Sequence, residues 1–226
     1  MVPFPRRLII LAGHYGSGKT NLAVQLALTL RETHDRVAVA DLDIVNPYYR
    51  TKDAAARLQS AGIRLIASPF AGSNLDAPAM TSETGQIFDD PGLAAVADVG
   101  GDDRGALALG RYAAKIAALG ADAQMWFVFN QRRPLSATPE DALAILREVE
   151  AAGHVPFTGL INNTNLGPDT APDTVLSSLP VIAELSRLSG LPIIMTSVRR
   201  DLCPALTGQI DDLFPLDILQ KAEWRL

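Results

Sequence analysis

Three glycines, a lysine and a threonine lie close together near the start of the sequence. Gly13–Thr20 reads GHYGSGKT and fits the pattern G-x-x-x-x-G-K-[ST], between an apolar run and an apolar helical pattern. Glycines let the backbone curl so that its N–H groups point at phosphate oxygens, at the positive end of the next helix dipole. Lys19 adds a positive charge, and Thr20 adds a hydroxyl for Mg²⁺. We call this segment the phosphate loop. The residues expected to contact a nucleotide here are Gly13, His14, Tyr15, Gly16, Ser17, Gly18, Lys19, Thr20 and Asn21.

Acidic residues follow two further apolar runs. VAVADLD places Asp41 and Asp43 at the end of one run, and LAAVADV delivers Asp98 to the end of another, followed by Gly101. Ligands of parallel sheets bind at the edge where the carboxyl ends of the strands meet. A carboxylate at this edge can orient a water or hold Mg²⁺, and a glycine can turn its N–H onto a terminal phosphate. Each carboxylate has an alternative role as a helix cap or a solvated loop charge.

Apolar runs alternate with Ala/Leu-rich helical patterns over the whole sequence. This alternation predicts an α/β fold, a doubly wound and mostly parallel sheet with helices on both faces. Strands are expected to end at Ala12, Asp41, Ser68, Val99, Asn130, Asn162 and Ser197. Helices are expected to begin near Lys19, Thr51, Thr81, Arg104, Pro139, Pro172 and Asp201.

Length and composition predict one globular domain over residues 1–226, because a chain of this size with 48% hydrophobic residues can form a single core. The net charge of −5 argues against nucleic acid or an anionic membrane as a general partner. Cys203 is the only cysteine, so neither an intrachain disulfide nor a paired-cysteine metal site can form. The first apolar run is too short for a signal peptide, and we expect a cytoplasmic protein.

The segments GHYGSGKT, DLDIVNPYYR, DVGGDD and GLINNTN resemble, in this order, a family of P-loop ATPases. The family includes the septum-site-determining and chromosome-partitioning ATPases, the arsenite-pump ATPase and the nitrogenase iron protein. The resemblance implies that Asp43 orients the attacking water in switch I, and that Asp98 and Gly101 belong to switch II. Lys19 and Asp43 are then the expected catalytic residues. The expected magnesium site contains Thr20, Asp41 and Asp98.

The same resemblance places a base-reading asparagine at Asn162 or Asn163, and the sequence does not decide between them. Guanine-specific relatives read the base with an Asp in N-K-x-D, and NNTN has no such Asp, which favours ATP. Many family members carry a second lysine that crosses a dimer interface. This chain has His14 there, which is less reliably cationic. Arg50, Arg132 or Arg199 are alternative sources of that charge.

We therefore expect a Mg²⁺-dependent ATP-binding protein that hydrolyses ATP slowly to ADP. Homodimerisation across the phosphate-loop face would make it a switch that acts on an unidentified protein partner. One alternative is an ATP-dependent small-molecule kinase or ligase similar to dethiobiotin synthetase and the cobyrinic acid amide synthetases. In that case SPFAGSNLDAPAM and NQRRP would line an acceptor pocket. Another alternative is a nucleotide sensor that does not hydrolyse.

Overall fold

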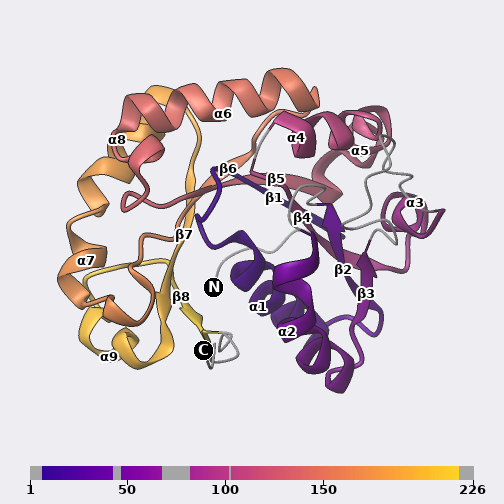
Figure 1. Ribbon diagram of the computed structural model, residues 1–226, viewed down its shortest axis with the longest axis horizontal. Coiled ribbons are helices and arrows are strands. Elements are labelled where there is room, and N and C mark those ends of the chain that lie inside the picture. The colour runs from indigo at the N-terminus through magenta and orange to yellow at the C-terminus, as the bar shows by residue number, and fades with distance from the viewer. Residues whose placement is uncertain (1–6, 43–46, 68–81, 102, 219–226) are drawn as a thin grey trace.

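A single parallel sheet forms the centre of the molecule (Figure 1). The computed structural model describes residues 7–42, 47–67, 82–101 and 103–218. Within them the eight strands follow the order β3-β2-β4-β1-β5-β6-β7-β8, and every neighbouring pair is parallel. The strands are β1 (Leu8–Ala12), β2 (Val37–Leu42), β3 (Arg64–Ala67), β4 (Ala94–Val99), β5 (Ala123–Phe129), β6 (Gly159–Asn162), β7 (Ile193–Arg199) and β8 (Leu213–Leu216). The expected parallel α/β architecture is confirmed.

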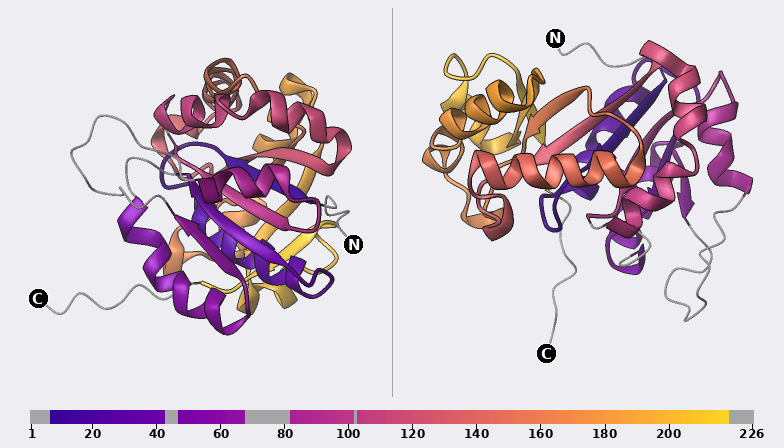
Figure 2. Two further views of the ribbon diagram at one scale, coloured as in Figure 1. Left: turned by 90° about the vertical axis from the view of Figure 1, so that its right-hand side faces the viewer. Right: turned by 90° about the horizontal axis from the view of Figure 1, so that it is seen from above.

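Helices cover both faces of the sheet (Figures 1 and 2). Helices α1 and α2 pack on one face, and α3, α4, α5, α6 and α8 pack on the other. No helix in the described part of the chain is long and apolar enough to cross a membrane. The helices are α1 (Lys19–Arg31), α2 (Pro47–Ser60), α3 (Ser82–Asp89), α4 (Asp103–Gly110), α5 (Ala113–Leu119), α6 (Pro139–Gly153), α7 (Pro172–Leu176), α8 (Leu179–Ser189) and α9 (Cys203–Leu206).

The central strand β1 shows why these runs form strands. All five of its residues are fully buried. Leu8 and Ile10 face the core beneath α3 to α6 and α8, whereas Ile9 and Leu11 face the core beneath α1 and α2. A strand buried on both faces needs an uninterrupted apolar run, which is the pattern of this segment. Burial on both sides fixes the position of the loop that follows β1.

The structure differs from the expected elements in a few places. Strand β8 was not expected, since its sequence LFPL is short and contains Pro215. Proline fits there because β8 lies at the edge of the sheet. Helix α2 begins at Pro47 rather than near Thr51. Near Asp201 only a short 3₁₀ turn and the four-residue α9 form. Asp43 lies outside the described residues.

Candidate functional site

The phosphate loop joins β1 to α1 at the carboxyl edge of the sheet. Its three glycines have positive φ angles, 149° at Gly13, 76° at Gly16 and 91° at Gly18, which other residues rarely adopt. Helix α1 begins directly after Gly18 without a side-chain cap. An uncapped helix start presents backbone N–H groups and the positive end of the dipole, the arrangement that binds anions.

The ammonium of Lys19 is held at the loop. The residue is only 1% exposed, and Nζ donates hydrogen bonds to the carbonyl oxygens of Gly13 at 2.8 Å and His14 at 3.1 Å. A buried ammonium is costly without such partners. The positive charge of Lys19 is therefore fixed within the loop rather than directed into solvent.

A hydroxyl and two carboxylates gather beside the loop. Thr20 Oγ1 donates a hydrogen bond to Asp98 Oδ2 at 2.6 Å. Asp41 of β2 pairs in register with Asp98 of β4, and the two residues are 8% and 5% exposed. Paired residues of neighbouring parallel strands point to the same face of a sheet. The three residues expected to hold Mg²⁺ are thus brought together, although the described residues contain no cluster of three His, Cys, Asp or Glu side chains that could hold a metal.

The segment after β4 lies directly against the phosphate loop. A Cβ atom added to Gly101 would lie 2.6 Å from the backbone nitrogen of Tyr15. Only glycine fits so close to another backbone without a shift. Gly101 is therefore next to the loop, and α4 begins two residues later.

The structure distinguishes the two asparagines at the end of β6. Asn163 points to the phosphate loop: its Nδ2 donates to the Ser17 carbonyl at 2.6 Å, and its Oδ1 accepts from Ser197 Oγ at 2.6 Å. Its amide nitrogen passes so close to Gly18 that there is no room for a Cβ atom at that position. Asn162 is turned away, since its Nδ2 donates to Ser178 Oγ. Asn163 therefore links the loop to β7 through the two ends of its amide.

The remaining predicted residues of this region differ in their surroundings. Tyr15 is 56% exposed and lines the outer rim of the loop. Ser17 is fully buried, and its Oγ has no hydrogen-bond partner among the described residues. Asn21 lines the cavity described below, and its Nδ2 donates to the Asp217 carbonyl at 3.2 Å.

His14, Arg132 and Arg199 are sequence candidates for a second cation at the loop. His14 is half-buried, and burial together with the positive charges of Lys19 and Arg133 lowers the pKa of its imidazole from the ordinary value of 6.5. His14 is consequently neutral at pH 7. Arg132 donates to Ser177 Oγ, and Arg199 pairs with Asp201, so neither guanidinium is directed at the loop.

The cation that does approach the loop was missed by sequence reasoning. Arg133 Nε donates to the Gly16 carbonyl at 2.7 Å. It belongs to NQRRP, which the sequence indicated only as a segment for an acceptor pocket. The signal was present in the two arginines three and four residues after the end of β5, the strand that pairs with β1. The structure does not describe the side chain of Arg50.

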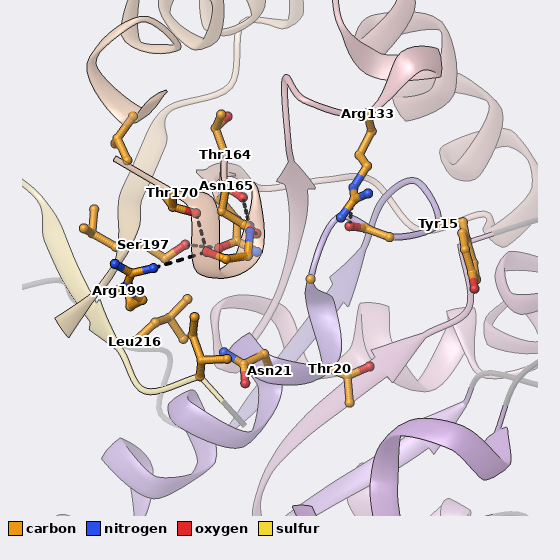
Figure 3. A pocket seen from close by; sticks show the side chains of 17 residues that line it. Tyr15, Thr20, Asn21, Arg133, Thr164, Asn165, Thr170, Ser197, Arg199 and Leu216 are labelled. Carbon is orange, nitrogen blue, oxygen red and sulfur yellow. Dashed lines mark hydrogen bonds between the residues drawn. The ribbon is translucent and has the colours of Figure 1, made fainter. Parts of the chain in front are cut away.

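A cavity of about 430 Å³ extends from the loop toward β7 and β8. Figure 3 shows Tyr15 and Arg133 at one end, and Ser197, Arg199 and Leu216 at the other. None of the described residues that line it is acidic. Beyond the loop, the lining consists of Asn21, Arg133, Asn163, Thr164, Asn165, Gly167, Thr170, Val175, Ser197, Val198, Arg199, Leu216 and Ile218.

Comparisons with known proteins give matches among solved structures alone: no protein-family model and no curated protein matches the sequence. Cell division protein FtsY from Thermotoga maritima has a TM-score of 0.57 and 20% identity, over 87% of this chain and 63% of that one. Signal recognition particle receptor FtsY from Elizabethkingia anophelis has a TM-score of 0.54 and 16% identity, over 84% and 58%. The signal recognition particle 54 kDa protein from Aeropyrum pernix K1, in complex with GDP, has a TM-score of 0.51 and 16% identity, over 86% and 42%.

This chain matches only 42% to 63% of the length of these three proteins, so each of them extends beyond the shared region. None of the three is one of the ATPases that the sequence motifs resemble. Membership of that ATPase family therefore stays a prediction. At 16% to 20% identity a structural likeness speaks for the fold alone. The eight-stranded parallel sheet and these likenesses together show that the chain has the α/β fold of the P-loop nucleoside triphosphatases.

Proposed function

We propose that the protein binds a nucleoside triphosphate with Mg²⁺ and hydrolyses it slowly, with ATP as the substrate. The observation that carries the proposal is the continuity between the phosphate loop and the cavity. The loop offers the buried ammonium of Lys19, and the cavity beyond it offers amide and hydroxyl groups among apolar side chains. A nucleotide has the same two parts, a charged phosphate chain and a flat base. A volume of about 430 Å³ is within the range of small-ligand pockets.

The residues beside the loop fit a magnesium ion. Mg²⁺ prefers oxygen ligands and is usually held by one or two carboxylates together with water and phosphate oxygens. Thr20, Asp41 and Asp98 supply a hydroxyl and two buried carboxylates on one face of the sheet. We propose that these three residues hold the ion directly or through water. When bound, it would neutralise charge on the phosphate chain.

Catalysis of hydrolysis in this site depends mainly on positioning the attacking water and the phosphate chain and on stabilising the negative charge of the phosphates. A water oxygen forms a bond to the γ-phosphorus, while the bond from that phosphorus to the bridging oxygen breaks and ADP leaves with the electron pair. The proton lost by the water passes to the phosphate product or to solvent. Lys19 stabilises the negative charge on the phosphate oxygens. Asp43 is proposed to orient the attacking water, on the evidence of the sequence motif alone.

The lining of the cavity supports ATP over GTP. Guanine presents N–H donors on its N1 and N2 edge, which a carboxylate accepts well. The described lining has no carboxylate, and it offers amides and hydroxyls such as Asn165, Thr170 and Ser197. Adenine, with one amino donor beside ring-nitrogen acceptors, suits such groups. Two solved structures of similar fold are complexes with GDP, so GTP is the competing substrate.

Hydrolysis is proposed to serve as a switch. Gly101 lies against the loop, and α4 begins two residues later. A γ-phosphate that attracts the backbone at Gly101 would therefore shift the start of α4. Leu107 of α4 is exposed, which offers an apolar contact for a partner protein or a second copy of the chain. Loss of the γ-phosphate would release this arrangement.

Calorimetry with Mg²⁺-ATP and Mg²⁺-GTP tests the proposal. The parent should bind ATP more tightly than GTP, and Lys19→Ala should lose at least tenfold in ATP affinity while it remains folded, because the loop loses its cation. Lys115→Ala is the matched control, since Lys115 is exposed and pairs with Asp89 on the surface. If GTP binds more tightly than ATP, the proposed substrate is GTP and not ATP. Equal affinity of Lys19→Ala and the parent would overturn the site, and ATP bound without phosphate release would favour a kinase, a ligase or a sensor.

A further inference from the structure

Arg133 is held in place at the outer side of the phosphate loop. Its Nε donates to the Gly16 carbonyl at 2.7 Å, and a Cβ added to Gly16 would lie 3.3 Å from the same nitrogen. Gly16 therefore leaves the space through which the guanidinium reaches the loop. The close-up in Figure 3 shows the Arg133 side chain directed at this part of the loop.

A tight turn fixes the backbone that carries Arg133. The Arg133 N–H donates to the Asn130 carbonyl at 3.1 Å, and the Ser136 N–H donates to the Arg133 carbonyl at 3.0 Å. Ser136 Oγ also donates to the Asn130 carbonyl. Asn130 and Ser136 are buried, and Pro134 restricts the backbone that follows. The turn lies beside the phosphate loop because β5 pairs with β1.

The guanidinium keeps capacity for a ligand. Within the described part of the chain its one hydrogen bond is that of Nε, and no carboxylate there pairs with it. A half-buried guanidinium has two further nitrogens that bind phosphate oxygens in a fork. The neighbouring Arg132 is different, because it is exposed and donates to Ser177 Oγ.

We propose that Arg133 is a catalytic residue that acts within its own chain. Its terminal nitrogens bind the β- and γ-phosphate oxygens of the nucleotide in the adjoining loop and stabilise the charge that develops during hydrolysis. The inference rests on the proposed function. It also explains how a chain with the neutral His14 completes its site without a cation from a second subunit. A P-loop protein with an arginine supplied by its own chain turns over at roughly 10⁻² s⁻¹, and one without it about 30-fold more slowly.

Single-turnover hydrolysis of Mg²⁺-ATP tests the assignment. Arg133→Ala should lower the rate about 30-fold or more while the dissociation constant of ATP rises about threefold or less, since the charge is needed mainly in the transition state. Arg133→Gln can keep a hydrogen bond to Gly16 without the charge and should be equally slow. Added guanidinium ions should partly restore Arg133→Ala and leave Arg132→Ala, the matched control, at the parent rate. Circular dichroism verifies that each variant is folded.

Two further measurements separate catalysis within the chain from catalysis across a dimer. Aluminium fluoride should trap ADP on the parent and not on Arg133→Ala, although both bind ADP. A mixture of Lys19→Ala and Arg133→Ala should hydrolyse no faster than the residual rate of Arg133→Ala, because neither chain has a complete site. An unchanged rate in Arg133→Ala, or activity restored in the mixture, would overturn the inference. A parent that neither binds nor hydrolyses nucleotide would instead overturn the proposed function.

Discussion

The amide of Asn163 connects the phosphate loop to two strands. It joins the Ser17 carbonyl to the end of β6 and to Ser197 of β7. We predict that Asn163→Ala weakens ATP binding by up to about 30-fold, because the two buried hydrogen bonds that link the loop to β7 are each worth about 1 kcal/mol. Isothermal calorimetry measures this. Asn162→Ala is the control, since it loses bonds to Ser178 and Thr164 and should cost stability with little change in affinity. Parent-like affinity of Asn163→Ala would mean that the loop keeps its shape without the anchor.

Sequence reasoning found the loop itself, because Gly13–Thr20 combines backbone needs and charge in one contiguous segment. It could not choose between Asn162 and Asn163, since a shift of one residue at a strand end moves a side chain to the opposite face. It also missed Arg133, whose role depends on β5 lying next to β1. Contacts between distant segments are fixed by the order of the strands, which a local motif does not contain.

At the scale of the elements, Asp217 ties the end of β8 to two other parts of the fold. Arg57 of α2 and Arg200 after β7 both donate to its carboxylate, at 2.8 and 2.6 Å. Hydrogen bonds from Arg200 and then Arg57 lower the pKa of Asp217 below its ordinary value of 3.8. Because the folded pKa is the lower one, this stabilisation is present above about pH 4 and is lost as the pH falls through the folded value.

We therefore predict that Asp217→Asn lowers the free energy of unfolding at pH 7 by about 1 kcal/mol, the upper end for partly exposed ion pairs. Urea unfolding of the parent and the variant at pH 7 and in acid measures the difference in the free energy of unfolding. This difference should be smaller in acid, because the Asp217 carboxylate of the parent is protonated there. Asp201→Asn is the control, because among the described residues Asp201 forms an ion pair only with the nearby Arg199 and its loss should cost less. A difference that is equal at both pH values would show that the carboxylate charge has no part in holding β8.

Most elements could be predicted because burial on both faces requires continuous apolar runs, as in β1, β4 and β5. Strand β8 could not, because four residues with a proline carry no such pattern, and their pairing with β7 decides the structure. The helical pattern near Arg104 divides into α4 and α5, with Gly110 at the junction. A Cβ atom added to Gly110 would lie 3.4 Å from the backbone carbonyl oxygens of Ala152 and Gly153, so this junction packs closely against α6.

At the scale of the whole molecule, the charge at His14 bears on self-association. Many members of the ATPase family that the motifs resemble complete one site with a lysine from a second subunit. In this chain burial, Lys19 and Arg133 keep the pKa of His14 below 6.5. The imidazole is then neutral at pH 7, and it becomes charged only as the pH falls below its lowered pKa. A contact between His14 of a second copy of the chain and the bound nucleotide would consequently add little to the stability of a dimer.

We predict that the parent with Mg²⁺-ATP is mainly monomeric at neutral pH and micromolar concentration, and that His14→Lys forms an ATP-dependent dimer because its ammonium reaches the phosphates of a facing subunit. Light scattering with and without ATP measures this, with His14→Ala as the control that should bind ATP and remain monomeric. If Arg133 acts within its own chain, the rate per subunit in the parent should also be independent of protein concentration. A parent that dimerises fully at pH 7 would show that the interface needs no charge at position 14. If the parent stays monomeric and His14→Lys changes nothing, the dimeric switch loses its support and a kinase or ligase becomes the better account of the same loop.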